Sequence, residues 1–305
     1  MISRRSVLQG LAGFAATGLT LAGYAFGIEP RFRLSVTRYR IQPMGWPKGL
    51  SLKFAVIADL HAGEPYMPPG RIDEIVAVTN GLGADAILLL GDYAAGYRWQ
   101  SRKVPASKWA TLLSPLKAPL GVHAVLGNHD WWDDLDAQRN RKGPVIGRRA
   151  LEAVGIPVYE NDAVRLSKNG SAFWVVGLGD QLALKNGVKD GWLQFQGVDD
   201  LPGALAKVTD DAPVILLAHE PDVFPVVPSR VSVTLSGHTH GGQVRVFGYS
   251  PVVPSQFGNR FAYGHIVEDN RQLIVSGGLG CSYLPVRFGV PPEIVVVEIG
   301  HEGLA

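Results

Sequence analysis

The sequence predicts an α/β protein from three observations. Short apolar, partly β-branched runs indicate buried strands. These runs are Leu52–Ala58, Ala86–Leu90, Val122–Leu126, Val214–Ala218 and Val231–Leu235. Segments with apolar residues at helical spacing lie between several of the runs. Polar segments follow most of them directly, which is where an α/β sheet normally carries its active site. The order of the elements supports an α/β class and does not define a topology.

The N-terminal half is predicted to begin with a strand. Arg31–Val36 alternates between polar and apolar residues, so a strand with one wet face is expected there. Arg71–Leu82 carries a partial helical stripe that Gly81 and Gly83 can end. Two further predicted helices are Ser107–Leu116 and Pro144–Val154.

The C-terminal half is predicted to be richer in strands. Val164–Leu166 and Ala172–Leu178 predict a hairpin closed by residues 167–171. Gly179–Asp200 is long, polar and interrupted by glycine, which predicts either a substrate-covering loop or a mobile surface loop. Three later strands are expected to complete a second sheet: Val244–Phe247, Gln272–Ser276 and Glu293–Ile299.

Five polar segments supply side chains that bind metals or face phosphate. They are Asp59-Leu60-His61, Gly91-Asp92, Gly127-Asn128-His129-Asp130, His219 and Gly237-His238-Thr239-His240. Counted as ligands, they give two carboxylates, one amide oxygen and four imidazoles, enough for two divalent cations with positions left for water. Mixed nitrogen and oxygen ligands suit manganese, iron, zinc or cobalt better than calcium. Asp59 and His61 are two residues apart, so in an extended chain both side chains leave the same face.

The order D-x-H, G-D, G-N-H-D, H, G-H-x-H resembles the signature of the calcineurin-like metallophosphoesterases. The resemblance covers the chain from about Phe32 to the C-terminus and implies a four-layer α/β/β/α sandwich. It implies a binuclear centre, with manganese favoured, in which Asp92 bridges the two metals. The implied ligands of one metal are Asp59, His61, Asp92 and His240, and those of the other are Asp92, Asn128, His219 and His238.

Such a centre predicts hydrolysis of a phosphoester. Two divalent cations are offset by only two carboxylates, those of Asp59 and Asp92. The site therefore keeps a net charge of about +2 before water binds. This charge attracts phosphate and lowers the pKa of a metal-bound water, which produces a metal-bridging hydroxide near neutral pH. His129 cannot share the direction of Asn128 in an extended segment, so it is predicted to face substrate as a general acid or phosphoryl-oxygen donor. Asp130 is predicted to hold the tautomer of His129.

Segments beyond the signature bear on the substrate. Gly241–Arg245 and Gly277–Arg287 resemble an exported branch that includes YkuE- and YaeI-type phosphodiesterases, with relatives that hydrolyse UDP-2,3-diacylglucosamine in lipid A biosynthesis. Arg245 and Arg287 are candidates for binding substrate phosphate, because arginine matches phosphate bidentately, and pairing with a surface carboxylate is the alternative. Trp131 and Trp132 either form a lip for a nucleobase or acyl chain, or pack in the core.

The predicted activity is therefore that of a phosphodiesterase or pyrophosphatase acting on a small-molecule or lipid-linked substrate of the cell envelope. A phosphomonoesterase or nucleotidase is the alternative within the enzyme class. A non-catalytic metal-binding envelope protein is the alternative outside it, and the intact His129 argues against that reading. His123 is predicted to be packed or hydrogen-bonded within its strand, and His265 and His301 are predicted to lie on the surface.

Composition sets further bounds. The 305 residues are 46% hydrophobic and 18% charged, which is typical of a globular protein, and a net charge of +2 does not indicate a nucleic-acid partner. The ligands from Asp59 to His240 must meet at one point, so residues 31–305 are predicted to form one domain. A monomer is also expected. The single Cys281 excludes an internal disulfide and is expected to be a small buried residue.

The first 30 residues resemble a twin-arginine export signal. Arg4-Arg5 precedes a glycine- and alanine-rich apolar stretch from Gly10 to Ile28, and such an arginine pair is read by the export machinery. An ordinary secretory signal or a membrane anchor is the alternative. Gly23-Tyr24-Ala25 is a tolerable cleavage site, and both cleavage and retention stay open. The expected location is the periplasm or the outer face of the cytoplasmic membrane.

Overall fold

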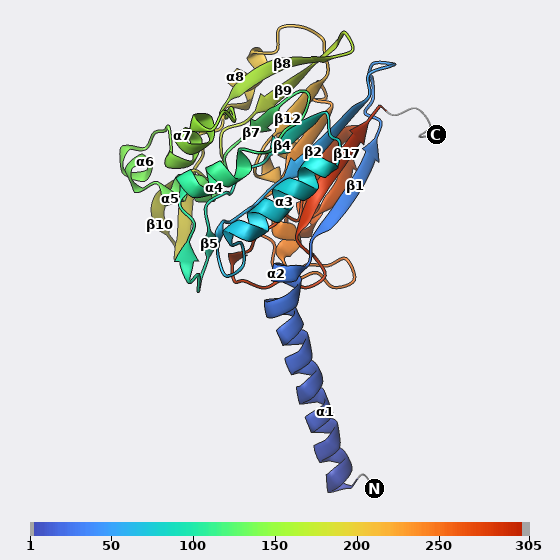
Figure 1. Ribbon diagram of the computed structural model, residues 1–305, viewed down its shortest axis with the longest axis vertical. Helices are drawn as coiled ribbons and strands as arrows, with labels where there is room; N and C mark the ends of the chain where they lie inside the picture. The colour runs from blue at the N-terminus through green and yellow to red at the C-terminus, as the bar shows by residue number, and fades with distance from the viewer. Residues whose placement is uncertain (1–2, 301–305) are drawn as a thin grey trace.

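A computed structural model, which describes residues 3–300, places two β-sheets face to face (Figure 1). The first sheet has the order β1 (Ser35–Ile41), β17 (Glu293–Ile299), β2 (Leu52–Ile57), β4 (Ala86–Leu89) and β7 (Val122–Ala124). The second has the order β14 (Gly264–Glu268), β15 (Arg271–Val275), β13 (Val233–Ser236), β12 (Val214–Leu217), β9 (Ser171–Gly177) and β8 (Asp162–Lys168).

The space between the sheets is filled by alternate side chains from the central strands. Phe54 and Val56 of β2 point into this inner core, whereas Ala55 and Ile57 belong to the core on the outer face. The ring of Phe54 meets that of Phe173 in the second sheet with centroids 6.1 Å apart. Because both faces of these strands are covered, their sequences are continuous apolar runs.

Helices cover the two outer faces. The first sheet is covered by α3 (Pro69–Gly81), α4 (Ala106–Leu113) and α7 (Ile146–Ala153). The second is covered by α8 (Leu201–Ala206) and the 3-10 turns η2 (Pro221–Val226) and η4 (Gly258–Phe261). The layers are therefore α/β/β/α, and the predicted fold class is confirmed.

Shorter elements complete the described chain. They are β3 (Gly63–Glu64), β5 (Gly96–Tyr97), β6 (Arg102–Lys103), α5 (Asn128–Asp133), α6 (Leu135–Asn140), β10 (Leu184–Lys189), β11 (Trp192–Gln196), η3 (His240–Gly242) and β16 (Ser282–Tyr283). The predicted helices are found within a few residues of their expected ends. The predicted hairpin is also confirmed, because β8 and β9 pair antiparallel.

Two predictions in loop and edge segments were wrong. Arg31–Val36 is not one strand, since Arg31 and Phe32 end the helix α2 (Glu29–Phe32), in which Pro30 suits the first helical turn. The predicted loop Gly179–Asp200 contains the antiparallel hairpin β10–β11. Asp190 and Gly191 close it with φ values of 52° and 80°, the left-handed backbone that a two-residue hairpin turn requires.

Two further predictions about strands were wrong. Val244–Phe247 forms no ladder, because Phe247 and Gly248 turn the chain back so that Val246 pairs with Tyr249. β17 does not join the second sheet: it lies between β1 and β2 of the first, parallel to β1 and antiparallel to β2. All of its residues except the half-buried Glu298 are buried, as expected for a strand inside a covered sheet.

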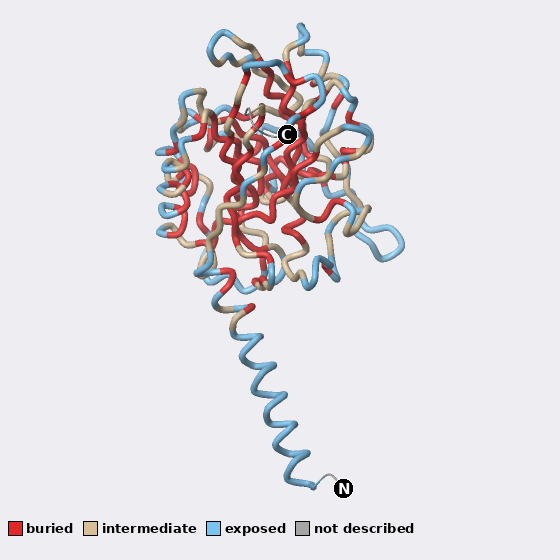
Figure 2. Tube along the Cα trace, turned by 90° about the vertical axis from the view of Figure 1, so that its right-hand side faces the viewer, coloured by how far each residue is buried: buried red, intermediate tan, exposed pale blue. Residues whose placement is uncertain are grey.

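A long N-terminal helix stands away from the sandwich (Figures 1 and 2). It comprises α1 (Arg4–Gly23), one π-helical turn η1 (Tyr24–Ile28) and α2. Figure 2 shows that α1 is exposed along its length, and none of its residues is buried. By length and composition the helix is able to cross a membrane, a property that a secretory signal shares.

Candidate metal centre

The seven candidate ligands lie where strands of the two sheets end. In the first sheet, Asp59 follows β2 and Asp92 follows β4. Asn128 begins α5, a few residues after β7. In the second sheet, His219 follows β12, and His238 and His240 follow β13. The carboxyl ends of both sheets therefore point at one region, as expected for an α/β site.

One donor group consists of Asp59, His61 and His240, whose ligand atoms all lie within 4.8 Å of one another. His61 Nε2 lies 3.1 Å from His240 Nε2. His240 Nε2 lies 3.5 Å from Asp59 Oδ1. Two imidazole nitrogens and one carboxylate oxygen at these separations can converge on a single divalent cation.

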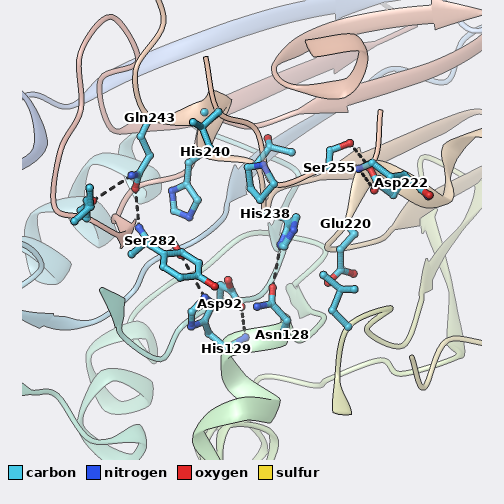
Figure 3. A pocket seen from close by; sticks show the side chains of 18 of the residues that line it. Asp92, Asn128, His129, Glu220, Asp222, His238, His240, Gln243, Ser255 and Ser282 are labelled. Atoms are coloured by element: carbon cyan, nitrogen blue, oxygen red, sulfur yellow. Dashed lines mark hydrogen bonds between the residues drawn. The ribbon is translucent and has the colours of Figure 1, made fainter. Parts of the chain in front are cut away.

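A second donor group consists of Asp92, His219 and His238. His219 Nε2 lies 3.3 Å from Asp92 Oδ2. Asn128 Oδ1 lies 2.9 Å from His238 Nδ1, and Figure 3 marks this contact between the two side chains with a dashed line. Asp92 Oδ2 also lies 3.6 Å from His61 Nε2, so this carboxylate stands between the two groups.

The buried polar atoms of the two groups fit a cation. Asp59 Oδ2 and His219 Nε2 are buried without a hydrogen-bond partner among the described residues. His61 Nδ1 faces the carbonyl of Ala94 at 2.9 Å, and His219 Nδ1 faces that of Leu90 at 2.7 Å. A ring that donates from Nδ1 to a carbonyl keeps a lone pair on Nε2, the usual arrangement behind a metal-binding histidine.

Burial shapes the ionisation of these groups. Burial lowers the pKa of His61, His238 and His240, which favours the neutral imidazoles that metals bind. Burial also raises the pKa of Asp59 to about 7, against the opposing effect of His219. For Asp92, burial is outweighed by the facing histidines, His219 first, which hold its pKa well below the ordinary value.

The ligand segments are not extended, and the sequence-based argument that assumed an extended chain was wrong on this point. Asp59 and His61 have φ values of 53° and 46°, and Asp92 has 56°. His238 and His240 repeat the conformation at 66° and 52°. Non-glycine residues in this left-handed region cost conformational energy and cluster at functional sites. The side chains converge because the loops curl, and not because a strand alternates.

Two glycines leave room for the ligands. A Cβ on Gly127 would lie 2.3 Å from Asp92 Oδ1 and 2.7 Å from His219 Cε1. A Cβ on Gly278, whose φ is +67°, would lie 2.7 Å from Asp59 Cβ. Any side chain at either position would displace a candidate ligand.

Comparison with known sequences agrees with this geometry. Residues 52–242, more than half of the chain, match the profile of the calcineurin-like phosphoesterase family. The chain belongs to the calcineurin-like phosphoesterases. It is therefore a metal-dependent phosphoester hydrolase.

Relatives of this calcineurin-like phosphoesterase align over most of its length. It is 29% identical over 308 residues to the uncharacterised metallophosphoesterase YkuE of Bacillus subtilis. This alignment covers 98% of each chain. It is 29% identical over 310 residues to the phosphodiesterase YaeI of Escherichia coli, covering 98% of this chain and 100% of YaeI. A transmembrane protein with a metallophosphoesterase domain from Bos taurus is 26% identical over 305 residues, covering 93% of this chain and 60% of that protein.

His129 of this calcineurin-like phosphoesterase faces the cavity from the first turn of α5, which is helical and not extended as expected. Its Nε2 lies 3.3 Å from the hydroxyl of Ser282. Its ring packs edge-on against His61, with centroids 4.8 Å apart. Burial lowers the pKa of His129 to about 3, against the opposing effect of Asp92. The ring is therefore neutral near neutral pH.

Asp130 does not contact the His129 ring, and its predicted role in setting that tautomer is corrected. Its Oδ1 accepts the backbone N–H groups of Tyr93 and Ala94, and its Oδ2 accepts those of Asp92 and Gly127. The buried carboxylate thus ties the segment that carries Asp92 to the start of α5. Its four acceptor positions are occupied by backbone groups.

Neither candidate phosphate-binding arginine points into the cavity. Arg287 is fully buried and donates to the carbonyls of Gly277, Gly280 and Val290, with one nitrogen 3.1 Å from His240 Nδ1. Arg245 donates to the hydroxyl of Ser250. The predicted phosphate contacts are corrected, because tertiary packing directs Arg287 onto backbone carbonyls behind the site.

The cavity that opens onto the donor groups has a volume of about 920 Å³. Trp132 lines it and stacks on Phe195 of the β10–β11 hairpin with centroids 4.9 Å apart, whereas Trp131 is buried in the core. Of the two roles that the sequence left open, Trp132 is placed as a lip of the cavity and Trp131 packs in the core. Sequence reasoning did not single out Phe195 or Ser282. Both lie in segments that it linked to the substrate, Gly179–Asp200 and Gly277–Arg287, but no motif marks either side chain.

Other predictions concern single residues outside the site. His123 is buried and faces the Leu120 carbonyl at 2.8 Å and the Tyr159 hydroxyl at 3.1 Å, as predicted for a hydrogen-bonded core residue. Cys281 is buried and His265 is exposed, as predicted. His301 lies outside the described residues.

Proposed function

We propose that this calcineurin-like phosphoesterase hydrolyses a phosphodiester or pyrophosphate in a cell-envelope or nucleotide-linked lipid. The cavity carries the proposal, because donor side chains line one part of it and apolar side chains line much of the remainder. The apolar lining residues include Leu182, Phe195, Val252, Leu284 and Val286. A volume of about 920 Å³ far exceeds what one phosphate needs, and the apolar part suits a bulky second substituent on phosphorus.

The proposed binuclear centre uses the two donor groups together with Asn128. One cation would be held by Asp59, His61, Asp92 and His240, and the other by Asp92, Asn128, His219 and His238. Manganese is the favoured metal, with iron, zinc and cobalt compatible with the same donors. When bound, two such cations would supply a nucleophile at neutral pH and offset charge on the phosphoryl oxygens.

His129 is the proposed catalytic side chain outside the metal ligands. Its ring lines the cavity beside the donor groups, and its low pKa makes a neutral N–H donor the form present at neutral pH. Such a donor can stabilise charge that develops on a phosphoryl or leaving-group oxygen. Ser282 lies within 3.3 Å of Nε2 and would orient the ring.

The N-terminal segment gives the proposed location. Arg4 and Arg5 are exposed on α1 and precede an apolar helix, which supports a twin-arginine export address. Export through that route carries folded protein, so the metal centre would be assembled before export. Residues 31–305 would act as one monomeric domain in the periplasm or at the outer face of the cytoplasmic membrane.

Metal analysis followed by substrate comparison tests the proposal. Purified full-length protein loaded with manganese should contain about two metals per chain. It should hydrolyse bis-p-nitrophenyl phosphate faster than p-nitrophenyl phosphate, and a UDP-linked diacyl sugar faster than either. One tight metal with full activity would contradict the binuclear centre, and preference for the monoester would favour a phosphomonoesterase.

A further inference from the structure

Exposed apolar side chains gather on two loops that border the cavity. We call this set the apolar rim: Phe247, Tyr249, Val252, Tyr283 and Leu284. Phe247 is fully exposed at the tip of the turn between Val246 and Tyr249, and Val252 is 74% exposed. Val252, Tyr283 and Leu284 also line the cavity. Single exposed apolar residues are common on protein surfaces. A cluster of them beside an opening instead marks an interaction surface.

The two loops that carry the apolar rim are joined to each other. The backbone N–H of Arg245 donates to the carbonyl of Phe288 at 2.8 Å, and the N–H of Phe288 donates to the carbonyl of Gln243 at 2.8 Å, so that Val244 and Phe288 form an isolated bridge. Gln243 donates from its side chain to the carbonyl of Leu284 at 3.1 Å. The rim is therefore one surface built on a connected pair of loops.

The same loops hold the foot of the N-terminal helix. Arg287 donates its backbone N–H to the carbonyl of Ala25 at 2.9 Å. The ring of Phe288 meets that of Tyr24 edge-on, with centroids 6.2 Å apart. Val290 donates its backbone N–H to Glu29 Oε1 at 3.0 Å. Figure 1 shows these orange and orange-red loops beside α2, at the end of the domain from which α1 leaves.

The helix matches a bilayer in length and chemistry. No charged residue lies between Arg5 and Glu29, and this run is about 35 Å long at a rise of about 1.5 Å per residue. The hydrocarbon core of a bilayer is about 30 Å thick. Phe32, Arg31 and Arg33 are exposed where the helix meets the domain, so an aromatic ring and two cations would lie at the level of the lipid headgroups.

We propose that the apolar rim rests in the surface of the phospholipid bilayer that holds α1, so that the cavity receives its phosphoester directly from the membrane. The inference rests on the proposed hydrolysis of a lipid-linked substrate and names how that substrate is presented. The lining of the same cavity also includes the apolar side chains of Val286, Phe195 and Trp132. An acyl chain can therefore stay in apolar surroundings while the phosphoester reaches the donor groups.

The proposal requires that the helix is retained. Cleavage after Ala25 would remove Tyr24 and Ala25, which contact Phe288 and Arg287 next to the cavity. The folded domain thus uses residues that a cleaved signal would discard. The mass of the protein recovered from membranes tests this requirement, and a mass corresponding to loss of the first 25 residues would overturn it.

A depth measurement tests the contact between rim and lipid. Full-length Phe247→Cys is labelled with an environment-sensitive fluorophore and reconstituted in phosphatidylcholine and phosphatidylglycerol vesicles, some with brominated acyl chains. Cys281 is buried and should take up little label. The matched control is Val267→Cys, which is 54% exposed and pairs with Gln272 near the start of β15, at the end of the sheet opposite the site.

The label at position 247 should shift to shorter wavelength and be quenched by the brominated lipid, and the label at 267 should do neither. Equal solvent exposure of both labels would overturn the proposal.

An activity measurement separates this proposal from the proposed function. Phe247→Glu combined with Tyr249→Glu changes rim residues that do not line the cavity, and Val267→Glu is the control. The rim variant should hydrolyse soluble bis-p-nitrophenyl phosphate at the wild-type rate. Its hydrolysis of a long-chain diacyl sugar nucleotide held in vesicles should fall about tenfold or more, because charged side chains resist the lipid surface.

Equal vesicle activity of wild type and rim variant, with soluble activity intact, would reject the membrane contact alone. Wild-type protein inactive on every phosphoester would reject the proposed function, while the fluorescence result would still decide the membrane contact.

Discussion

The backbone N–H of His129 donates to Oδ1 of Asp92 at 2.8 Å. Oδ2 of the same carboxylate lies 3.6 Å from His61 Nε2 and 3.3 Å from His219 Nε2. The carboxylate that stands between the two donor groups therefore also holds the start of α5, from which the His129 ring reaches the cavity. The position of the candidate catalytic ring is coupled to the geometry of the metal centre.

Replacing His129 should separate catalysis from metal binding. We expect His129→Ala to lower kcat about 10²- to 10⁴-fold while leaving both metals bound, because a transition-state donor is lost. His238→Ala should instead lower metal content, and added manganese should partly restore its activity. Elemental analysis beside steady-state kinetics measures both effects. A His129→Ala protein that has lost a metal and recovers when metal is supplied would identify His129 as a ligand.

Replacing Asp130 should affect stability more than proton transfer. Asp130→Asn puts an NH2 group where a carboxylate oxygen accepts two backbone N–H groups, so donors would face donors. We expect a loss of roughly 3 kcal/mol in the free energy of unfolding, measured by urea denaturation. Asp136→Asn, an exposed change on the neighbouring helix, should alter it by less than about 0.5 kcal/mol. Unchanged stability with a shifted pH–rate profile would restore the tautomer role predicted from sequence.

Replacing Gly127 should disrupt the metal centre by steric means alone. The new Cβ of Gly127→Ala would meet both Asp92 and His219 at less than van der Waals distance. We expect metal affinity and kcat/KM to fall together, each by about tenfold or more. Gly70→Ala is the control, because a Cβ there meets nothing within 4 Å. Full metal content in Gly127→Ala would show that the two ligand loops can separate at little cost.

Replacing the arginines should show that neither binds substrate. Arg287→Lys cannot reach the three carbonyls that the guanidinium spans, so we expect a lower Tm and weaker metal binding. Arg245→Lys should leave KM within about twofold of wild type, since its side chain donates to Ser250 and neither residue lines the cavity. Thermal denaturation and substrate titration measure these effects. A raised KM for Arg287→Lys at unchanged Tm would indicate that Arg287 binds substrate, as the sequence predicted.

Replacing the arginine pair tests the export address. Arg4→Lys with Arg5→Lys should leave the protein in the cytoplasm with its activity intact, because the receptor of the proposed twin-arginine route would read the arginines and both side chains are exposed on α1. Fractionation followed by an activity assay measures this. Normal export of the double variant would indicate a general secretory signal or a simple anchor.

The sequence by itself determined the α/β class of the fold and the pool of candidate ligands, and the layered arrangement was only what the family resemblance implied. Apolar runs such as Leu52–Ala58 and Val214–Ala218 are typical of strands that are covered on both faces. Polar residues at the ends of such strands must meet, because the carboxyl ends of parallel strands share one edge. These are local or periodic properties, and a sequence records them directly.

Only the tertiary structure decided what the side chains touch. Arg287 bonds backbone carbonyls, and Asp130 bonds the backbone of a loop that lies 36 to 38 residues away in sequence. β17 lies between β1 and β2, and the loops at Phe247 and Phe288 meet the foot of the N-terminal helix. The physical reason is that these contacts join segments far apart in the chain. Their partners are chosen by packing in three dimensions, which no spacing of residues along the chain encodes.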